Sequence, residues 1–199
     1  MTNRLEQLTK LARVKGVIRS RDLIDVGLAR QYLSIACNRG LLERVGYGLY
    51  CLPNAMQNEH RSLIEVCKWV PSGVICLLSA LRYHGMTTQL PFEVWLAIPP
   101  RTRTPIIDTV QVRFIRFSGM ALTEGIEKHE IEGAQLRVYH PAKTVADCFK
   151  FRNKIGTDIA IEALRDCLRQ KKATINELVH FSRFCRVERV MAPYMEAML

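Results

Sequence analysis

The pattern that most constrains the fold lies in the first quarter of the chain, where a helical stretch is followed at once by two strand-like runs. Residues 28–38 have apolar side chains at helical spacing, and Gly40 is suited to the left-handed conformation that ends a helix. Residues 41–45 and 49–52 are joined by Gly46-Tyr47-Gly48, whose glycines supply the positive φ of tight turns. A β-hairpin directly after a helix predicts a wing.

Two further helical segments precede this helix. Residues 3–14 carry leucines at helical spacing, and residues 17–18 are typical of a short edge strand. Ser20 is a good N-cap for a second helix, which Gly27 keeps short. The order of helix, short helix, helix and hairpin predicts a winged helix-turn-helix, with residues 28–38 as the recognition helix.

Polar side chains of the recognition helix share one face. Arg30, Ser34 and Asn38 follow each other at intervals of four residues, and Gln31 lies beside them. Arginine can read guanine, and asparagine or glutamine can read adenine, whereas a wing mainly contacts phosphate. Any amphipathic helix has a polar face, so this face alone does not predict DNA binding. The prediction rests on the hairpin that follows the helix. The predicted DNA-binding set is Ser20, Arg21, Arg30, Gln31, Ser34, Asn38, Arg39, Arg44 and Tyr47.

The charge balance agrees with a polyanionic partner. The chain has 29 Lys and Arg against 19 Asp and Glu, a net charge of +10. The first 55 residues hold nine basic and four acidic side chains, so the charge density is highest there. A surplus of this size favours nucleic acid as the partner, although some proteins are basic without binding any.

Hydropathy excludes a membrane protein at the level of the sequence. The longest apolar run spans residues 74–81 and includes a serine, whereas a membrane span needs about 20 residues. The first fifteen residues mix charges with isolated leucines, which is unlike a secretory signal. We therefore expect a cytoplasmic protein without a membrane segment.

The seven cysteines are widely spaced and form no C-x-x-C pair. An odd number without close ligand pairs argues against both a disulfide framework and a structural zinc site. Most of them have apolar neighbours, so we expect buried, small hydrophobic side chains. Neither a metal nor a cofactor is predicted.

The rest of the chain predicts a second domain after a break at residues 53–57. Its pattern is helices, then strands, then helices: helices over 59–69 and 74–84, strands over 93–98, 110–117 and 136–139, and helices over 141–151, 158–170, 175–184 and 187–197. We therefore predict an α+β fold. A winged helix-turn-helix over residues 1–55 is followed by a mixed α/β domain over 56–199 with a small sheet and several helices.

This second domain shows no pattern typical of an enzyme. It lacks a nucleophile elbow, a phosphate-binding glycine loop and a His-Glu-x-x-His motif. Lys143 and Asp147 are expected to form a local ion pair on a helix, worth a few tenths of a kcal/mol. Arg101 and Arg103 lie in a proline-bounded, extended loop. They form a possible secondary basic site, for phosphate or an acidic partner, or simply a solvated loop.

Three groups of residues together resemble the AbiEi family, the antitoxins of type IV toxin–antitoxin systems. They are Gly40-Leu-Leu-Glu-Arg-Val-Gly-Tyr-Gly-Leu-Tyr50, Leu78-Ser-Ala-Leu-Arg-Tyr-His-Gly85, and Val138-Tyr-His-Pro-Ala-Lys-Thr-Val-Ala-Asp147 with Asp158-Ile-Ala-Ile-Glu-Ala-Leu164. The resemblance runs from about residue 5 to 185.

The resemblance implies that the winged helix binds double-stranded operator DNA and represses its own operon. It also implies a C-terminal domain that counteracts a nucleotidyltransferase-like toxin without a stable complex. The implied DNA contacts are Arg30, Gln31, Ser34, Asn38, Arg39 and Arg44. The motif residues of the second domain receive no chemical role: Ser79, His84, Lys143, Thr144 and Asp147. The oligomeric state stays open.

One alternative is a winged-helix module fused to a nuclease-like or RNA-binding domain. A nuclease needs a metal-binding carboxylate cluster, and Asp108 with Glu93 is the only strand-proximal pair that the sequence offers. Because no nucleophile, base and oxyanion set can be composed, the expectation is a protein that is not an enzyme.

Overall fold

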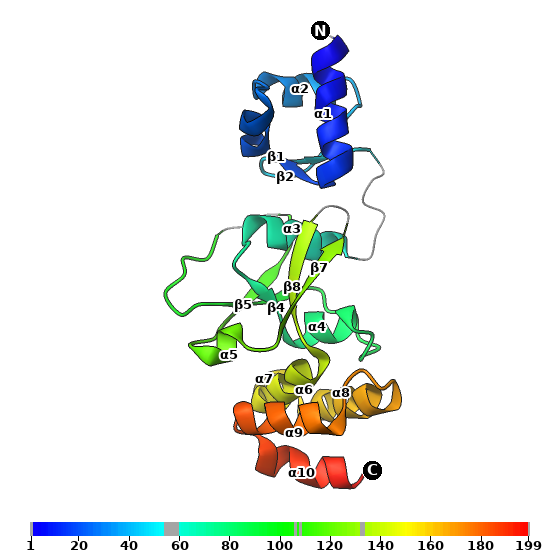
Figure 1. Cartoon of the computed structure of the whole chain (residues 1–199), viewed down its shortest axis with the longest axis vertical. Coiled ribbons are helices and arrows are strands. Elements are labelled where there is room, and N and C mark those ends of the chain that lie inside the picture. The colour runs from blue at the N-terminus through cyan, green and yellow to red at the C-terminus, as the bar shows by residue number, and fades with distance from the viewer. Residues whose placement is uncertain (1, 54–59, 106, 108, 132–133, 199) are drawn as a thin grey trace. The chain divides into compact units, whose positions relative to one another are not determined.

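The computed structural model describes residues 2–53, 60–105, 107, 109–131 and 134–198, and its helices and strands are labelled in Figure 1. Contacts divide the chain into two compact units. The first contains Met1–Pro71, Pro105–Gln111 and His129–Leu136, and the second contains Ser72–Thr104, Val112–Lys128 and Arg137–Leu199. The predicted domain boundary at residue 55 falls outside the described residues and stays a prediction.

The N-terminal elements follow the predicted winged-helix order. They are α1 (Thr2–Lys15), β1 (Ile18–Arg19), a 3-10 helix η1 (Ser20–Val26), α2 (Gln31–Asn38), β2 (Glu43–Gly46) and β3 (Leu49–Cys51). Helix α3 (Arg61–Trp69) belongs to the same unit. Apolar side chains from α1, η1 and α2 form one core, which includes Leu8, Leu23 and Leu33. This core holds α2 in place.

The second and third helices start differently from the prediction. The second is a 3-10 helix and its N-cap is Arg19, not Ser20. The carboxylate of Asp22 accepts the backbone N–H of Arg19 at 2.7 Å, so this side chain caps the helix. The third helix begins at Gln31 rather than at Leu28. The N–H of Leu28 instead bonds the carbonyl of Leu23 at 2.9 Å and closes the preceding turn.

A three-stranded sheet in the order β1-β3-β2 forms the wing, with both pairs antiparallel. Only one of the two predicted turn glycines has a positive φ: Gly48, at +67°. Gly46 is needed for a different reason, because a Cβ there would lie 2.9 Å from Oε1 of Glu65. The expectation of two left-handed glycines in this turn was therefore wrong.

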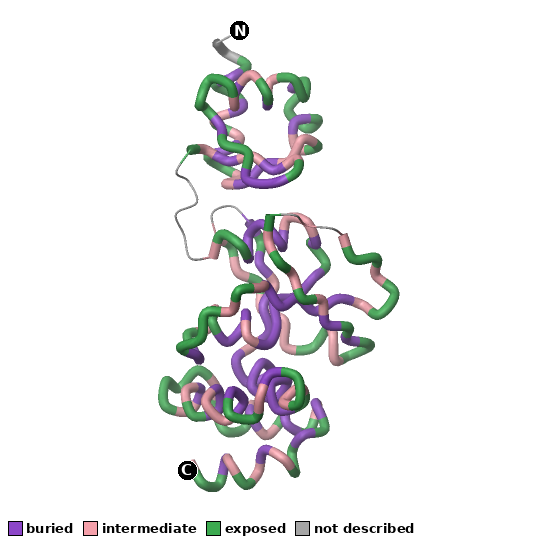
Figure 2. The backbone as a smooth tube through the Cα atoms, turned by 180° about the vertical axis from the view of Figure 1, so that it is seen from behind, coloured by how far each residue is buried: buried purple, intermediate pink, exposed green. Residues whose placement is uncertain are grey.

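A second sheet has the order β6-β5-β4-β8-β7. Its strands are β4 (Val74–Ile75), β5 (Val94–Ile98), β6 (Val112–Arg116), β7 (Ile126–Ile131) and β8 (Ala134–Tyr139). β4 pairs antiparallel with β5 and parallel with β8, and β5 pairs parallel with β6. Buried backbone, purple in Figure 2, runs through the central strands. This arrangement confirms a mixed α+β fold with a small sheet.

The predicted helix over residues 74–84 was wrong in its first part. Val74 and Ile75 form β4, and only Leu77–Tyr83 form helix α4. Every residue from Val74 to Leu77 is completely buried. A short, fully apolar run has no periodicity that distinguishes a central strand from a buried helix. The polar strand β7 was likewise not predicted as a full strand.

The C-terminal part is helical, as predicted. The helices are α6 (Pro141–Lys150), α7 (Arg152–Ile155), α8 (Thr157–Arg169), α9 (Ile175–Phe184) and α10 (Glu188–Glu196). The short helix α5 (Met120–Thr123) precedes β7 and was not predicted. α6 packs against α8 and α9, as Figure 1 shows. Pro141 lies in the first turn of α6, where its missing N–H costs no hydrogen bond. All side chains of α6 except Lys150 are buried.

Candidate nucleic-acid interface

Helix α2 is held by a buried face and by a glycine cap. Leu33 and Ala36 are buried in the N-terminal core. Gly40 has a φ of +67°, and the N–H of Leu41 bonds the carbonyl of Ala36 at 2.9 Å. This is the left-handed helix ending that the sequence predicts. The cap turns the chain directly into the wing.

The opposite face of α2 is exposed. Gln31, Ser34, Asn38 and Arg39 are solvent-exposed, and exposed Arg30 occupies the N-cap position of the helix. Because Arg30, Ser34 and Asn38 are spaced by four residues, they follow one another along this face. An exposed row of hydrogen-bonding side chains is what reading of base edges needs. The DNA contacts themselves stay a prediction.

The wing carries the predicted pair Arg44 and Tyr47. Nε of Arg44 donates to the carbonyl of Gly46 at 3.1 Å, and its guanidinium lies 5.5 Å from the centre of the Tyr47 ring. The Tyr47 side chain remains 76% exposed. A cation held over an exposed ring at the turn gives the wing a flat and positively charged tip.

Residues of η1 and α3 complete this surface. The Tyr47 ring stacks on Trp69 of α3, with 6.4 Å between ring centres and 25° between planes. A hollow of about 350 Å³ beside it is lined by Arg19, Ser20, Arg21, Tyr47, Gly48, Leu49, Lys68 and Trp69. The structure therefore brings the predicted residues Ser20, Arg21 and Tyr47 together within one unit.

Two basic residues of this hollow were missed by the sequence analysis. Burial lowers the pKa of Arg19, with a further contribution from the charge of Arg21. Burial also lowers the pKa of Lys68, whose Nζ donates to the carbonyl of Lys15 at 3.3 Å. No sequence signal connects Lys68 with the wing, because α3 lies beyond the apparent end of the winged-helix pattern.

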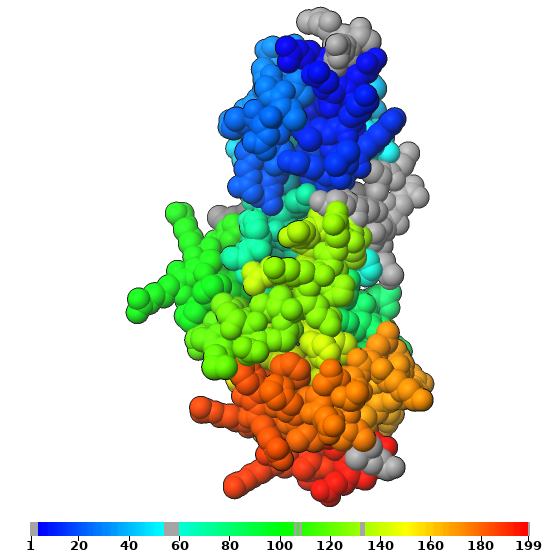
Figure 3. Space-filling model, in the orientation of Figure 1, coloured from blue at the N-terminus to red at the C-terminus, as the bar shows by residue number. Residues whose placement is uncertain are grey.

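Arg101 and Arg103 lie apart from these residues in the chain, in the second unit, and both are exposed. Their loop is not simply extended. The N–H of Thr102 bonds the carbonyl of Pro99 at 3.2 Å, and the guanidinium of Arg116 donates to the carbonyls of Pro99, Pro100 and Thr102. Green side chains of this loop extend from the surface in Figure 3. The expectation that the flanking prolines hold this segment extended is therefore wrong where the chain turns between Pro99 and Thr102.

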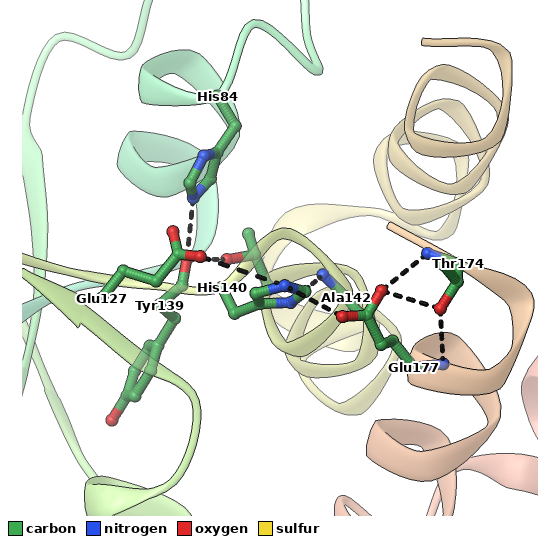
Figure 4. A network of polar contacts seen from close by, with 8 residues as sticks. His84, Glu127, Tyr139, His140, Ala142, Thr174 and Glu177 are labelled. Atoms are coloured by element: carbon green, nitrogen blue, oxygen red, sulfur yellow. Dashed lines mark hydrogen bonds and ion pairs between the residues drawn. The ribbon is translucent and has the colours of Figure 1, made fainter. Parts of the chain in front are cut away.

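Three motif residues of the second unit hold backbone in place. Oγ of Ser79 accepts the N–H of Trp95 at 2.9 Å, and Oγ1 of Thr144 donates to the carbonyl of Tyr139 at 3.1 Å. Nε2 of His84 donates to the same carbonyl at 2.7 Å, as Figure 4 shows. The Ser79 bond joins α4 to β5, and the bonds of His84 and Thr144 tie the end of β8 to the end of α4 and to α6. Each of the three residues therefore has a structural role.

Lys143 and Asp147 form a buried ion pair. Their side chains are 0% and 2% exposed, with 2.5 Å between Nζ and Oδ2. The ammonium group also lies 4.2 Å from the centre of the Tyr139 ring, and Sγ of Cys185 lies 3.4 Å from Oδ1 of Asp147. The expected few tenths of a kcal/mol applies to solvent-exposed pairs, whereas this pair is buried.

The nuclease alternative finds little geometric support. Glu93 is bound to Arg113 with 2.7 Å between Oε1 and Nε, and that guanidinium lies 4.8 Å from the centre of the Trp95 ring. Asp108 lies outside the described residues. Among the described residues, no three His, Cys, Asp or Glu side chains are grouped as a metal site.

The cysteines lie where the sequence predicts them. Six cysteines are buried and Cys37 is partly buried, and all are free thiols, which confirms small apolar roles for most of them. Burial raises the pKa of Cys167 to about 11.

Among the described helices, none has the length and apolar character needed to cross a bilayer.

The fold and the exposed face of α2 define a winged helix-turn-helix protein. Residues 6–53 match the model of the AbiEi_4 family, described as "Transcriptional regulator, AbiEi antitoxin". This match confirms the resemblance to the AbiEi family over residues 6–53.

A solved structure shares the fold of most of the chain. The crystal structure of the RV2827C protein from Mycobacterium tuberculosis superposes with a TM-score of 0.58 at 14% identity, covering 89% of this chain and 69% of that one. At this identity the likeness concerns the fold alone. No curated protein matches the chain in sequence.

Proposed function

We propose that this protein binds double-stranded operator DNA upstream of its own gene through α2 and the wing, and that it represses its own operon. The observation that carries the proposal is the exposed row formed by Arg30, Ser34 and Asn38. It lies on a helix whose other face is fixed in a core and whose end leads directly into a wing. The family match covers these same elements.

The hollow beside the wing supports a contact with the DNA backbone. Arg19, Arg21 and Lys68 line it together with Tyr47. Phosphate contacts of this kind fix the orientation of a protein on the duplex, whereas side chains in the groove read the sequence. We therefore assign base reading to Arg30, Gln31, Ser34 and Asn38. Backbone contacts are assigned to Ser20, Arg21, Arg39, Arg44 and Tyr47, and Arg101 and Arg103 are a secondary basic site.

The second part of the proposal concerns the antitoxin role. The resemblance of the motifs in the second unit to AbiEi antitoxins supports a C-terminal domain that counteracts a nucleotidyltransferase-like toxin without a stable complex. We propose no catalytic activity, because the motif side chains are engaged in backbone hydrogen bonds and in a buried ion pair. We further propose that the protein acts in the cytoplasm.

The deciding experiment is a titration of labelled DNA from upstream of the gene, with an unrelated fragment of equal length as the control. At about 0.15 M salt, a specific regulator should prefer its operator by about 10³-fold or more. Equal, weak and steeply salt-dependent binding to both fragments would contradict the operator proposal, because it would reflect only the net charge of the chain.

The variant Arg30→Ala should weaken operator binding by about 1–3 kcal/mol, because a base-reading arginine is lost. Binding to unrelated DNA should change much less. Both affinities are measured by fluorescence anisotropy, and Lys10→Ala, an exposed change on α1 that also removes one charge, is the matched control. An equal loss on both DNA fragments would remove Arg30 from sequence readout.

The variant Arg44→Ala should lower affinity for all sequences alike, because this residue is assigned to a phosphate. Loss of one such contact should also reduce the slope of log K against log salt by about one unit. The measurement is a series of titrations between about 0.05 and 0.2 M salt, a range in which phosphate contacts dominate the change in affinity. An unchanged slope would mean that Arg44 does not reach the backbone.

A further inference from the structure

The second unit contains a hollow that the proposed function does not use. It has a volume of about 780 Å³ and lies where α8 ends and α9 begins. Its lining residues are His140, Arg165, Leu168, Arg169, Lys171, Lys172, Ala173, Thr174, Ile175, Glu177 and Met198. Figure 4 shows part of this lining, with His140, Thr174 and Glu177 labelled. Its size falls in the range of small-molecule sites, about 300–1,000 Å³.

The lining is strongly cationic. Arg165, Arg169, Lys171 and Lys172 contribute four positive charges against the single carboxylate of Glu177. Arg169 is paired with Asp166 at 2.8 Å. For the other three cations, no carboxylate within the described ranges lies at ion-pair distance. The hollow therefore concentrates positive charge that the carboxylates of the described residues do not pair with.

Glu177, the carboxylate among the described lining residues, is already engaged. Oε2 of Glu177 accepts the backbone N–H of Thr174 at 2.7 Å and its hydroxyl at 2.8 Å. These bonds lower the pKa of Glu177. Oε1 lies 3.5 Å from Nε2 of His140. Because this capping box satisfies the start of α9, the attraction for anions comes from the basic side chains and not from the helix end.

An unusual backbone conformation presents two adjacent lysines. Lys171 has a φ of +53°, although it is not a glycine. The N–H groups of Lys171 and Lys172 bond the carbonyls of Leu168 and Cys167 at 3.1 and 3.0 Å, which folds the chain back at the end of α8. Both lysines line the hollow as a result. Adjacent cations on a tight turn suit an anion with several neighbouring phosphates.

The remaining lining is apolar, from Leu168, Ala173, Ile175 and Met198. Phosphate groups gain no binding free energy from contact with such a wall. An uncharged ring that packs against the wall buries apolar surface and so binds more tightly. A DNA duplex presents its phosphates outward and keeps its bases stacked, so it does not place an apolar body in a hollow. The combined chemistry is that of a free nucleotide.

We propose that this hollow binds a nucleoside triphosphate, with the phosphates at Arg165, Lys171 and Lys172 and the base against the apolar wall. The site lies in the second unit, and the proposal does not rest on the proposed operator binding. In the occupied hollow, Arg165 on α8 and Lys172, which follows the end of α8, would contact the same ligand.

The test is isothermal titration calorimetry of the full chain with each of the four ribonucleoside triphosphates, with and without Mg²⁺. Inorganic tripolyphosphate and a single-stranded RNA of about 20 nucleotides serve as comparison ligands. At least one nucleotide should bind once per chain and at least about tenfold more tightly than tripolyphosphate, because the apolar wall adds to the charge contacts.

The variants separate this site from general charge attraction. The double variant Arg165→Glu/Lys172→Glu should weaken nucleotide binding by at least about tenfold, while its exposed positions leave the fold intact. The matched control Arg189→Glu, exposed on α10 and outside the hollow, should change it by less than about threefold. The proposal is overturned if no nucleotide binds, if tripolyphosphate binds equally well or if the double variant binds normally. It is also overturned if RNA binds more tightly than every nucleotide and the double variant loses this RNA binding.

Discussion

The variant Lys143→Ala is expected to lose about 3–5 kcal/mol of unfolding free energy, the usual cost of breaking a buried ion pair. The change leaves Asp147 with a negative charge in an environment where only 2% of its side chain is exposed. It also removes the ammonium group from the faces of Tyr139 and Phe117, at 4.2 and 5.0 Å from their ring centres. Urea unfolding followed by circular dichroism measures the loss.

The destabilisation should depend on pH in a defined direction. Burial raises the pKa of Asp147, and the charge and hydrogen bond of Lys143 oppose that increase. Without Lys143 the pKa of Asp147 rises further, so the folded variant binds a proton that the unfolded chain releases. Between the ordinary carboxyl pKa and the raised value, stability therefore falls as pH increases. The loss should be smaller at about pH 5 than at about pH 8.

Two further variants test this explanation. Lys150→Ala removes a lysine from the exposed end of the same helix and should change stability by less than about 0.5 kcal/mol. Lys143→Met/Asp147→Leu replaces both charges with apolar groups and should recover most of the loss. If this double variant were as unstable as Lys143→Ala, packing rather than the orphaned carboxylate would explain the effect.

The second large effect is expected at Leu33, on the buried face of α2. Its side chain is 3% exposed within the N-terminal core, and Leu33→Ala should cost about 2–5 kcal/mol through lost burial and the cavity left behind. Because this core positions the exposed face of α2, operator affinity should fall in parallel with the folded fraction of the domain. Thermal unfolding and anisotropy titration measure the two quantities on the same sample.

The neighbouring residue provides the matched control. Ser34 is exposed on the opposite face of α2, so Ser34→Ala should leave stability within about 0.5 kcal/mol of the parent. Any loss of operator binding in this variant would then arise at the interface itself. Normal operator binding at a temperature where the Leu33→Ala domain is mostly unfolded would argue against α2 as the recognition helix.

Local chemistry allowed much of the N-terminal unit to be predicted. Gly27 and Gly40 both have positive φ where the sequence requires helix endings, and Gly48 has one in the hairpin turn. These signals depend on the backbone of one or two residues, so they need no tertiary context. The exposed row on α2 follows in the same way from helical spacing.

Features that depend on contacts distant in sequence were not predictable. The burial of Lys143 and Asp147 requires Tyr139, Phe117 and Cys185, which come from other elements. The identity of Val74 and Ile75 as a strand depends on β5 and β8 on either side. Likewise, the place of Lys68 in the hollow depends on its approach to the wing. The spacing of residues along one segment does not reveal which other elements of the chain pack against it.

The edges of the second sheet carry charges, with a consequence for self-association. β6 and β7 are its edge strands, and they present exposed charged side chains, Arg113 and Arg116 on one and Lys128 and Glu130 on the other. Adding a strand from another copy would bring these charges against a new backbone, which disfavours edge-to-edge aggregation. These charges thereby disfavour growth of the sheet into fibrillar assemblies.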